Sequence, residues 1–134
     1  TNLELGGYSK GKKETQDLSK GQFQINDNRS LSEIMDELIN KGYIPSFCTA
    51  CYRLGRTGEH FMEFSVPGFI KRYCTPNALL TMAEYLEDYA SKETKEKGYN
   101  LIEEKIAELS KDQRVERLKN KIGQIKAGQR DLYF

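Results

Sequence analysis

All three cysteines of this 134-residue chain lie in one stretch, which begins Cys48-Thr49-Ala50-Cys51 and ends, after twenty-two further residues, at Cys74. Two thiols in a CxxC segment can point to the same side of a tight turn and bind one metal ion or one metal cluster. Cys74 would add a third ligand and order the loop between. We therefore expect Cys48, Cys51 and Cys74 to be metal ligands.

Three thiol ligands leave the fourth position of such a site to be explained. A structural zinc ion takes four ligands, and His60, the only histidine of the chain, could join the three cysteines. A [4Fe-4S] cluster held by three thiolates instead keeps one iron open to an external ligand. A third interpretation is that the thiols bind no metal, because a CxxC pair alone is a weak signal. The spacing does not decide among these alternatives.

The composition is typical of a soluble globular protein, with 37% hydrophobic and 31% charged residues. No apolar run reaches the roughly 18 residues of a membrane span, so we expect no membrane insertion. An odd number of cysteines cannot be fully paired in disulfides, which favours reduced thiols and a cytoplasmic location. The first residues show neither a signal core nor an initiator Met, so we expect a piece of a longer protein.

The charge distribution gives little support for binding to nucleic acid, because the net charge is only +1. Residues 111–130 are locally basic, but they lack the interleaved aromatic side chains on which bases stack. We therefore expect a solvated helix face there, with a small nucleic-acid binder as an alternative hypothesis.

Two arginines, Arg53 and Arg56, flank the Gly55-x-x-Gly58 segment that follows the second cysteine. With the backbone amides of the turn, their guanidinium groups could hold an anion or offset the negative charge of a cluster. The simpler interpretation is that the glycines only turn the chain. The lack of GxSxG and HExxH motifs leaves no basis for a Ser-His-Asp triad or a zinc protease.

Residues 1–47 are expected to combine strands with one helix. Alternating or extended apolar patterns indicate strands at 2–8, 22–25 and 43–47. Between the last two, Ser30 and Glu33 form a capping box that starts a helix, and Gly42 ends it.

Residues 48–134 are expected to be mainly helical. We expect a loop over residues 51–67, held against the core by Phe61, Met62 and Phe64. A short helix through residues 67–73 and a longer one, capped by Thr75 with Pro76 at its first position, follow.

The last third of the chain is expected to hold two more helices. Residues 92–98 are predicted to be a charged break before a helix that carries Leu101 to Leu109. A final helix over 112–127 should end at Gly128 and bury four apolar residues, Val115, Leu118, Ile122 and Ile125. Residues 131–134 are too apolar for a free segment, and we expect them to dock.

A family resemblance is carried by three groups of residues around the cysteines. They are Ile44-Pro45-Ser46-Phe47-Cys48-Thr49-Ala50-Cys51-Tyr52-Arg53-Leu54-Gly55-Arg56-Thr57-Gly58, then Phe61-Met62, then Cys74-Thr75-Pro76-Asn77. This pattern resembles the C-terminal region of HydG, the family of radical S-adenosylmethionine tyrosine lyases that assemble the active-site cluster of [FeFe]-hydrogenases. The upstream Gly6-Gly7-Tyr8 and Gln22-Phe23-x-Ile25-x-Asp27-x-Arg29-Ser30 resemble the end of the barrel in these enzymes.

The resemblance implies an α+β, mainly α chain. Residues 1–47 would be the last strands and helix of a radical S-adenosylmethionine (β/α) barrel, and residues 48–134 a helical domain with an auxiliary iron-sulfur cluster. Cys48, Cys51 and Cys74 would ligate this [4Fe-4S] cluster, whose open iron joins an extra iron. The family cleaves tyrosine into p-cresol and a glycine-derived fragment, which becomes carbon monoxide and cyanide on that iron.

The chain departs from the family in lacking the CxxxCxxC signature for S-adenosylmethionine and a second [4Fe-4S] cluster. We therefore expect no catalytic residue in this piece and no tyrosine cleavage by it alone. The implied partners are the rest of the barrel and the maturation proteins that receive the iron product, and neither a membrane nor a nucleic acid is among them. His60 is expected to be a surface residue. The piece is also expected to self-associate through an apolar barrel edge at Leu3, Leu5, Phe23 and Ile25.

Overall fold

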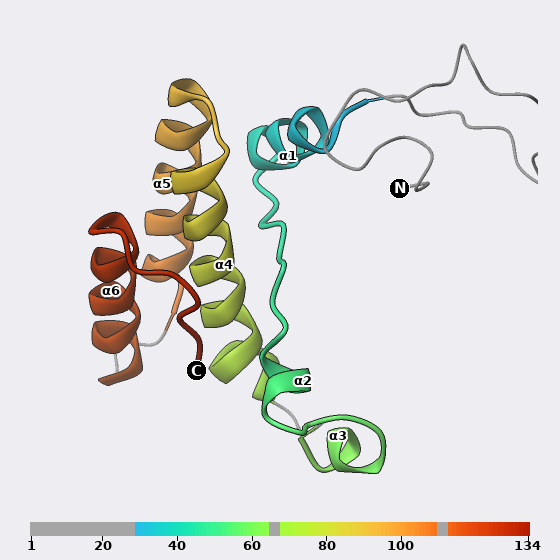
Figure 1. Cartoon of the computed structure of the whole chain (residues 1–134). Helices are drawn as coiled ribbons and strands as arrows, with labels where there is room; N and C mark the ends of the chain where they lie inside the picture. The colour runs from blue at the N-terminus through green and yellow to red at the C-terminus, as the bar shows by residue number, and fades with distance from the viewer. Residues whose placement is uncertain (1–28, 65–67, 110–112) are drawn as a thin grey trace, which may run out of the picture.

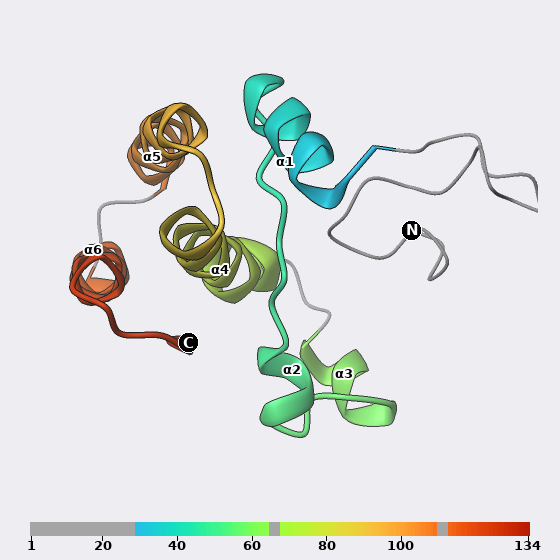
Figure 2. The same ribbon diagram turned by 45° about the horizontal axis from the view of Figure 1, so that its top comes forward.

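The computed structural model describes residues 29–64, 68–109 and 113–134. Its elements are α1 (Leu31–Asn40), α2 (Ala50–Arg53), α3 (Glu59–Phe64), the π-helix η3 (Ile70–Cys74), α4 (Thr75–Asp88), α5 (Lys92–Ala107) and α6 (Gln113–Lys126). Helices α4, α5 and α6 form one body; α1 lies beside α5, and α2 and α3 project near the start of α4 (Figure 1 and Figure 2).

Helix α4 is the centre of this body. Five of its apolar side chains, Leu79, Leu80, Met82, Ala83 and Leu86, have no exposed surface. Helices α5 and α6 both pack on α4, and α1 adds Met35 and Ile39 to the same core. Helix α4, which follows Cys74 directly, therefore has more buried side chains than any other described helix.

The mainly helical character is confirmed, whereas no strand is present among the described residues. Residues 43–49 run as an extended segment beside α4 without forming a strand, so the strand prediction for 43–47 is wrong. Without a neighbouring strand, an extended segment has no ladder to join. The predicted strands at 2–8 and 22–25, and the predicted self-association edge, lie outside the described residues. The boundary between residues 47 and 48 stays a prediction.

The local signals at both ends of the described chain are confirmed. In α1 the Glu33 amide donates to Ser30 Oγ at 3.2 Å, and the Ser30 amide donates to Glu33 Oε2 at 2.7 Å, which completes the capping box. Helix α6 buries the four apolar residues named for it. The chain leaves that helix through Gly128, whose φ of 102° suits glycine.

Two predictions for the middle of the chain are wrong. The expected loop over 51–67 contains α2 and α3, and Phe61, expected to be tucked in, is 45% exposed; the side chains of Met62 and Phe64 are not among those described. Thr75 does not cap α4, because Cys74 before it is already helical (φ −68°, ψ −45°) and η3 continues into α4. Pro76 has no amide hydrogen to donate, and it stands where the wider turn of η3 passes into α4.

The expected break at 92–98 is also wrong, because α5 begins at Lys92. Ser91 caps it by accepting a hydrogen bond from the Thr94 amide at 3.1 Å. The charged residues of this turn lie on its outer face, whereas Thr94 and Gly98 are buried. Among the described residues, no helix combines the length and apolar character needed to cross a membrane.

Candidate metal centre

The three cysteines come from two separate stretches of the chain, residues 48–51 and the end of η3, near the start of α4. Cys48 lies in the extended segment before α2, Cys51 lies in α2, and Cys74 ends η3. All three are half-buried. The extended segment is held against α4 by the Phe47 amide, which donates to Thr81 Oγ1 at 3.3 Å.

The thiols are close enough to influence one another electrostatically. Burial raises the pKa of the Cys74 thiol, and the charges of Cys51 and then Cys48 raise it further. A thiolate next to another thiolate is disfavoured unless a cation offsets the charge. Both views place α2, which carries Cys51, beside the start of α4, which follows Cys74 directly (Figure 1 and Figure 2).

The described side chains do not include a preformed group of three His, Cys, Asp or Glu residues at metal-binding distances. A [4Fe-4S] cluster binds each thiolate through a different iron, so its ligands do not have to converge on one metal ion. The donor set itself is all thiol, which suits zinc or an iron-sulfur cluster. By donor chemistry, Cys48, Cys51 and Cys74 fit a [4Fe-4S] cluster with one open iron. His60 is exposed on α3 and is not part of a metal-binding group in the described structure.

The π-helix η3 determines how Cys74 enters α4. Its wider turn is tied at its start by the Arg72 amide, which donates to the Gly68 carbonyl at 3.0 Å. Short π-helical turns are uncommon and occur frequently at functional sites. This turn had no recognisable sequence signal.

The two arginines predicted for the cluster environment have separate surroundings. Arg53 forms an ion pair with Asp131, whose hydrogen bond raises the pKa of the guanidinium, and its Cζ lies 5.5 Å from the centre of the Tyr133 ring. Arg56 instead lies over the ring of Tyr73, with Cζ 5.4 Å from its centre. Anion binding by either arginine stays a prediction.

Sequence reasoning missed a third arginine in this region. Arg114, at the start of α6, places its Cζ 5.8 Å from the centre of the same Tyr73 ring. The guanidinium groups of Arg56 and Arg114 therefore both lie over the ring of Tyr73, the residue that precedes Cys74. Such a contact between distant segments leaves no local sequence signal, although Tyr73 could have been singled out by its position next to a cysteine.

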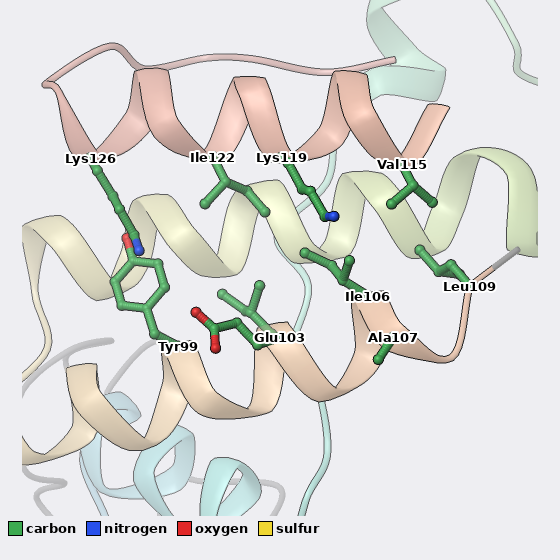
Figure 3. A pocket seen from close by; sticks show the side chains of 10 residues that line it. Tyr99, Glu103, Ile106, Ala107, Leu109, Val115, Lys119, Ile122 and Lys126 are labelled. Atoms are coloured by element: carbon green, nitrogen blue, oxygen red, sulfur yellow. The ribbon is translucent and has the colours of Figure 1, made fainter. Parts of the chain in front are cut away.

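A hollow lies between α5 and α6, and its described lining contains no cysteine. It has a volume of about 450 Å³. Figure 3 shows Tyr99 and Ile106 of α5 facing Ile122 and Lys126 of α6 across it. Lys126 Nζ lies 4.0 Å from the centre of the Tyr99 ring, which partly closes one end. Its walls are mainly apolar, and it has no link to the thiol chemistry.

Comparison with known proteins relates this arrangement to a solved structure. No family model matches the chain, and no curated protein matches it. Among solved structures, a crystal structure of HydG, described as a maturase of the [FeFe]-hydrogenase, matches 87% of the chain at 44% sequence identity and a TM-score of 0.78. The chain is similar to a part of HydG. The resemblance expected from the cysteine stretch is confirmed.

The match covers only part of the HydG chain. The chain spans 26% of the HydG chain, and so about three quarters of HydG has no counterpart in it. The similarity concerns both sequence and fold, because 44% identity accompanies the structural agreement.

Proposed function

We propose that this chain is the part of a HydG-type maturase that binds an auxiliary [4Fe-4S] cluster through Cys48, Cys51 and Cys74. The observations that support this proposal are the half-buried state of the three thiols and the position of α2 beside the start of α4, which follows Cys74 directly. The similarity to a maturase of the [FeFe]-hydrogenase supplies the context.

The chain would supply three thiolate ligands to the four irons of the cluster, which leaves one iron without a cysteine. When bound, the cluster would supply an open iron that joins an extra iron carrying carbon monoxide and cyanide. The three cysteines would hold the other irons, and a fourth protein thiolate would block the open position. The guanidinium groups of Arg56 and Arg114 lie over the ring of Tyr73, next to Cys74. Their positive charge there can offset the negative charge of thiolates and sulfides.

The complete enzyme would be a radical S-adenosylmethionine tyrosine lyase, for which this chain supplies only part. We propose that the remaining barrel carries S-adenosylmethionine and its own [4Fe-4S] cluster and covers the exposed apolar side chains beside the cysteines. These are Phe47, Tyr52 and Leu54, which are 45%, 79% and 42% exposed. Grouped apolar exposure of this kind is characteristic of a contact surface. Maturation partners in the cytoplasm would receive the iron product.

The test is anaerobic reconstitution of the purified chain with iron and sulfide, followed by metal analysis and electron paramagnetic resonance. We expect about four iron and four sulfide per chain, and a reduced-cluster signal. Cys74→Ser should lose most of both.

The same experiment separates the cluster from a zinc site of three cysteines and one histidine. His60→Ala is the control: cluster content should not change. Stoichiometric zinc that is lost in His60→Ala, with no cluster after reconstitution, would overturn the proposal.

A further inference from the structure

The segment 130–134, here called the strap, runs from α6 back along α4 toward the cysteines (Figure 1). It is attached to α4 through three polar side chains, Asp88, Glu84 and Asn77. These positions are separated by four and seven residues, so they lie on one side of the helix. The strap therefore follows the length of α4 from its end to its first turn.

Each attachment is a defined hydrogen bond. At the end of α4, Arg130 Nε and Nη2 donate to the Asp88 carboxylate at 2.9 and 2.6 Å. Glu84 Oε1 then accepts from the backbone amides of Asp131 and Leu132 at 2.7 and 3.2 Å.

At the start of α4, the Phe134 amide donates to Asn77 Oδ1 at 2.8 Å. Asn77 is only 3% exposed and lies three residues after Cys74. Helix α6 holds the same end of the strap, because Lys121 Nζ donates to the Tyr133 carbonyl at 2.7 Å. The strap is thus fixed from two helices.

The strap also reaches α2, which carries Cys51. Arg53, two residues beyond that cysteine, forms its ion pair with Asp131 across 78 positions of the chain and lies over the Tyr133 ring. Helix α2 has only four residues, and so short a helix depends on tertiary contacts for its position. The Arg53 contacts are therefore a link between α2 and the framework of α4.

We propose that the strap is a positioning element of the metal centre, and that the Arg53–Asp131 pair holds the CxxC turn at its distance from Cys74 before any metal binds. Arg53 is then a positioning residue and not an anion ligand. That this distance serves metal binding rests on the proposed function. The contacts between Arg53 and the strap do not depend on it.

The test measures the relation between Cys51 and Cys74 without metal. In a Cys48→Ser background these are the only two thiols, and a bifunctional bimane reagent that fluoresces after joining two thiols reports how often they meet. Asp131→Asn removes the charge but tolerates the backbone φ of 67° at this position, since Asn, like Asp, adopts the left-handed region. We expect crosslinking to become about two- to fivefold slower, as befits one exposed ion pair.

Arg53→Gln should slow crosslinking similarly, and Arg53→Lys should restore most of the rate. The double variant Arg53→Gln with Asp131→Asn should be no slower than Arg53→Gln alone, because that single variant already removes the ion pair. Glu93→Gln, which breaks the exposed Glu93–Lys97 pair of α5, is the matched control and should leave the rate unchanged. Circular dichroism and single-thiol labelling rates establish that each variant is folded and equally reactive.

The outcomes distinguish the positioning role of the strap from the proposed cluster binding. Wild-type crosslinking rates in Asp131→Asn, or additive effects in the double variant, would overturn the positioning role even if the chain binds a cluster. Slower crosslinking of Asp131→Asn in a chain that takes up no cluster would support the positioning role of the strap and overturn only the proposed function. With both proposals correct, Asp131→Asn should also incorporate less cluster than Glu93→Gln after the same reconstitution.

Discussion

Gly98 of α5 lies directly against Leu86 of α4: a Cβ atom at Gly98 would be 2.5 Å from Leu86 Cδ2 and 3.1 Å from Leu86 Cγ. Leu86 is fully buried, so its side chain has little room to move aside. We predict that Gly98→Ala lowers the free energy of unfolding, because overpacking costs about 1–3 kcal/mol. The better helix propensity of Ala returns only up to about 1 kcal/mol. Urea unfolding measures the difference.

Gly123 of α6 is the matched control for that substitution. A Cβ atom there would meet no described atom within 4 Å. Gly123→Ala should raise the free energy of unfolding by about 0.5–1 kcal/mol through helix propensity alone. Equal effects of the two substitutions would contradict the close packing of α5 on α4.

Asn77 connects the strap to the first turn of α4. Asn77→Ala leaves the Phe134 amide without its acceptor in a half-buried place, and loss of such a bond typically costs about 1–3 kcal/mol. We expect a lower unfolding midpoint in urea. Asn120→Ala, at an exposed position of α6, should change stability by much less. Similar effects of both variants would contradict a contribution of the Asn77–Phe134 hydrogen bond to stability.

The Arg130–Asp88 pair predicts a dependence of stability on pH. The hydrogen bonds from Arg130 hold the pKa of the Asp88 carboxyl below its usual value, against the opposing effect of burial. A carboxyl with a lower pKa in the folded state stabilises the fold above its unfolded pKa, and this contribution is lost as the pH falls through the folded pKa. The stability difference between wild type and Asp88→Asn should therefore be present at neutral pH and shrink as the pH falls below the usual pKa of an aspartic acid side chain, about 3.9. A difference that persists unchanged in acid would contradict this assignment.

Arg114 predicts an electrostatic effect on the proposed cluster. Its guanidinium lies over Tyr73, the neighbour of Cys74, so Arg114→Gln removes a positive charge near the site. We expect the reduction potential of the reconstituted cluster to fall by an amount on the order of tens of millivolts. Arg117→Gln, which removes an exposed charge of the same helix, is the control and should shift the potential less. Equal shifts in the two variants would exclude a specific role for Arg114.

The features that could be predicted from the sequence depend on residues close together in the chain. The capping box of Ser30 and Glu33 involves one helical turn, and the buried face of α6 follows from the spacing of Val115, Leu118 and Ile122. The three cysteines could be chosen as candidate ligands because thiols are few and their spacing is distinctive. The similarity to HydG could likewise be expected from the residues around them.

At residues 92–98, packing overrode local preference. Gly98 and its charged neighbours suggested a break, yet the missing Cβ lets α5 lie close to α4. Glycines and arginines after Cys51 suggested a loop, yet the chain forms α2 and α3 there.

The sequence by itself determined the ligand candidates, the capped helices and the amphipathic faces, since these depend on side-chain chemistry and short-range periodicity. Only the tertiary structure decided that Arg53 contacts Asp131, that Arg56 and Arg114 share Tyr73, and that Cys74 enters α4 through a π turn. Contacts between segments tens of residues apart depend on how the helices pack around α4, and no local pattern encodes that arrangement.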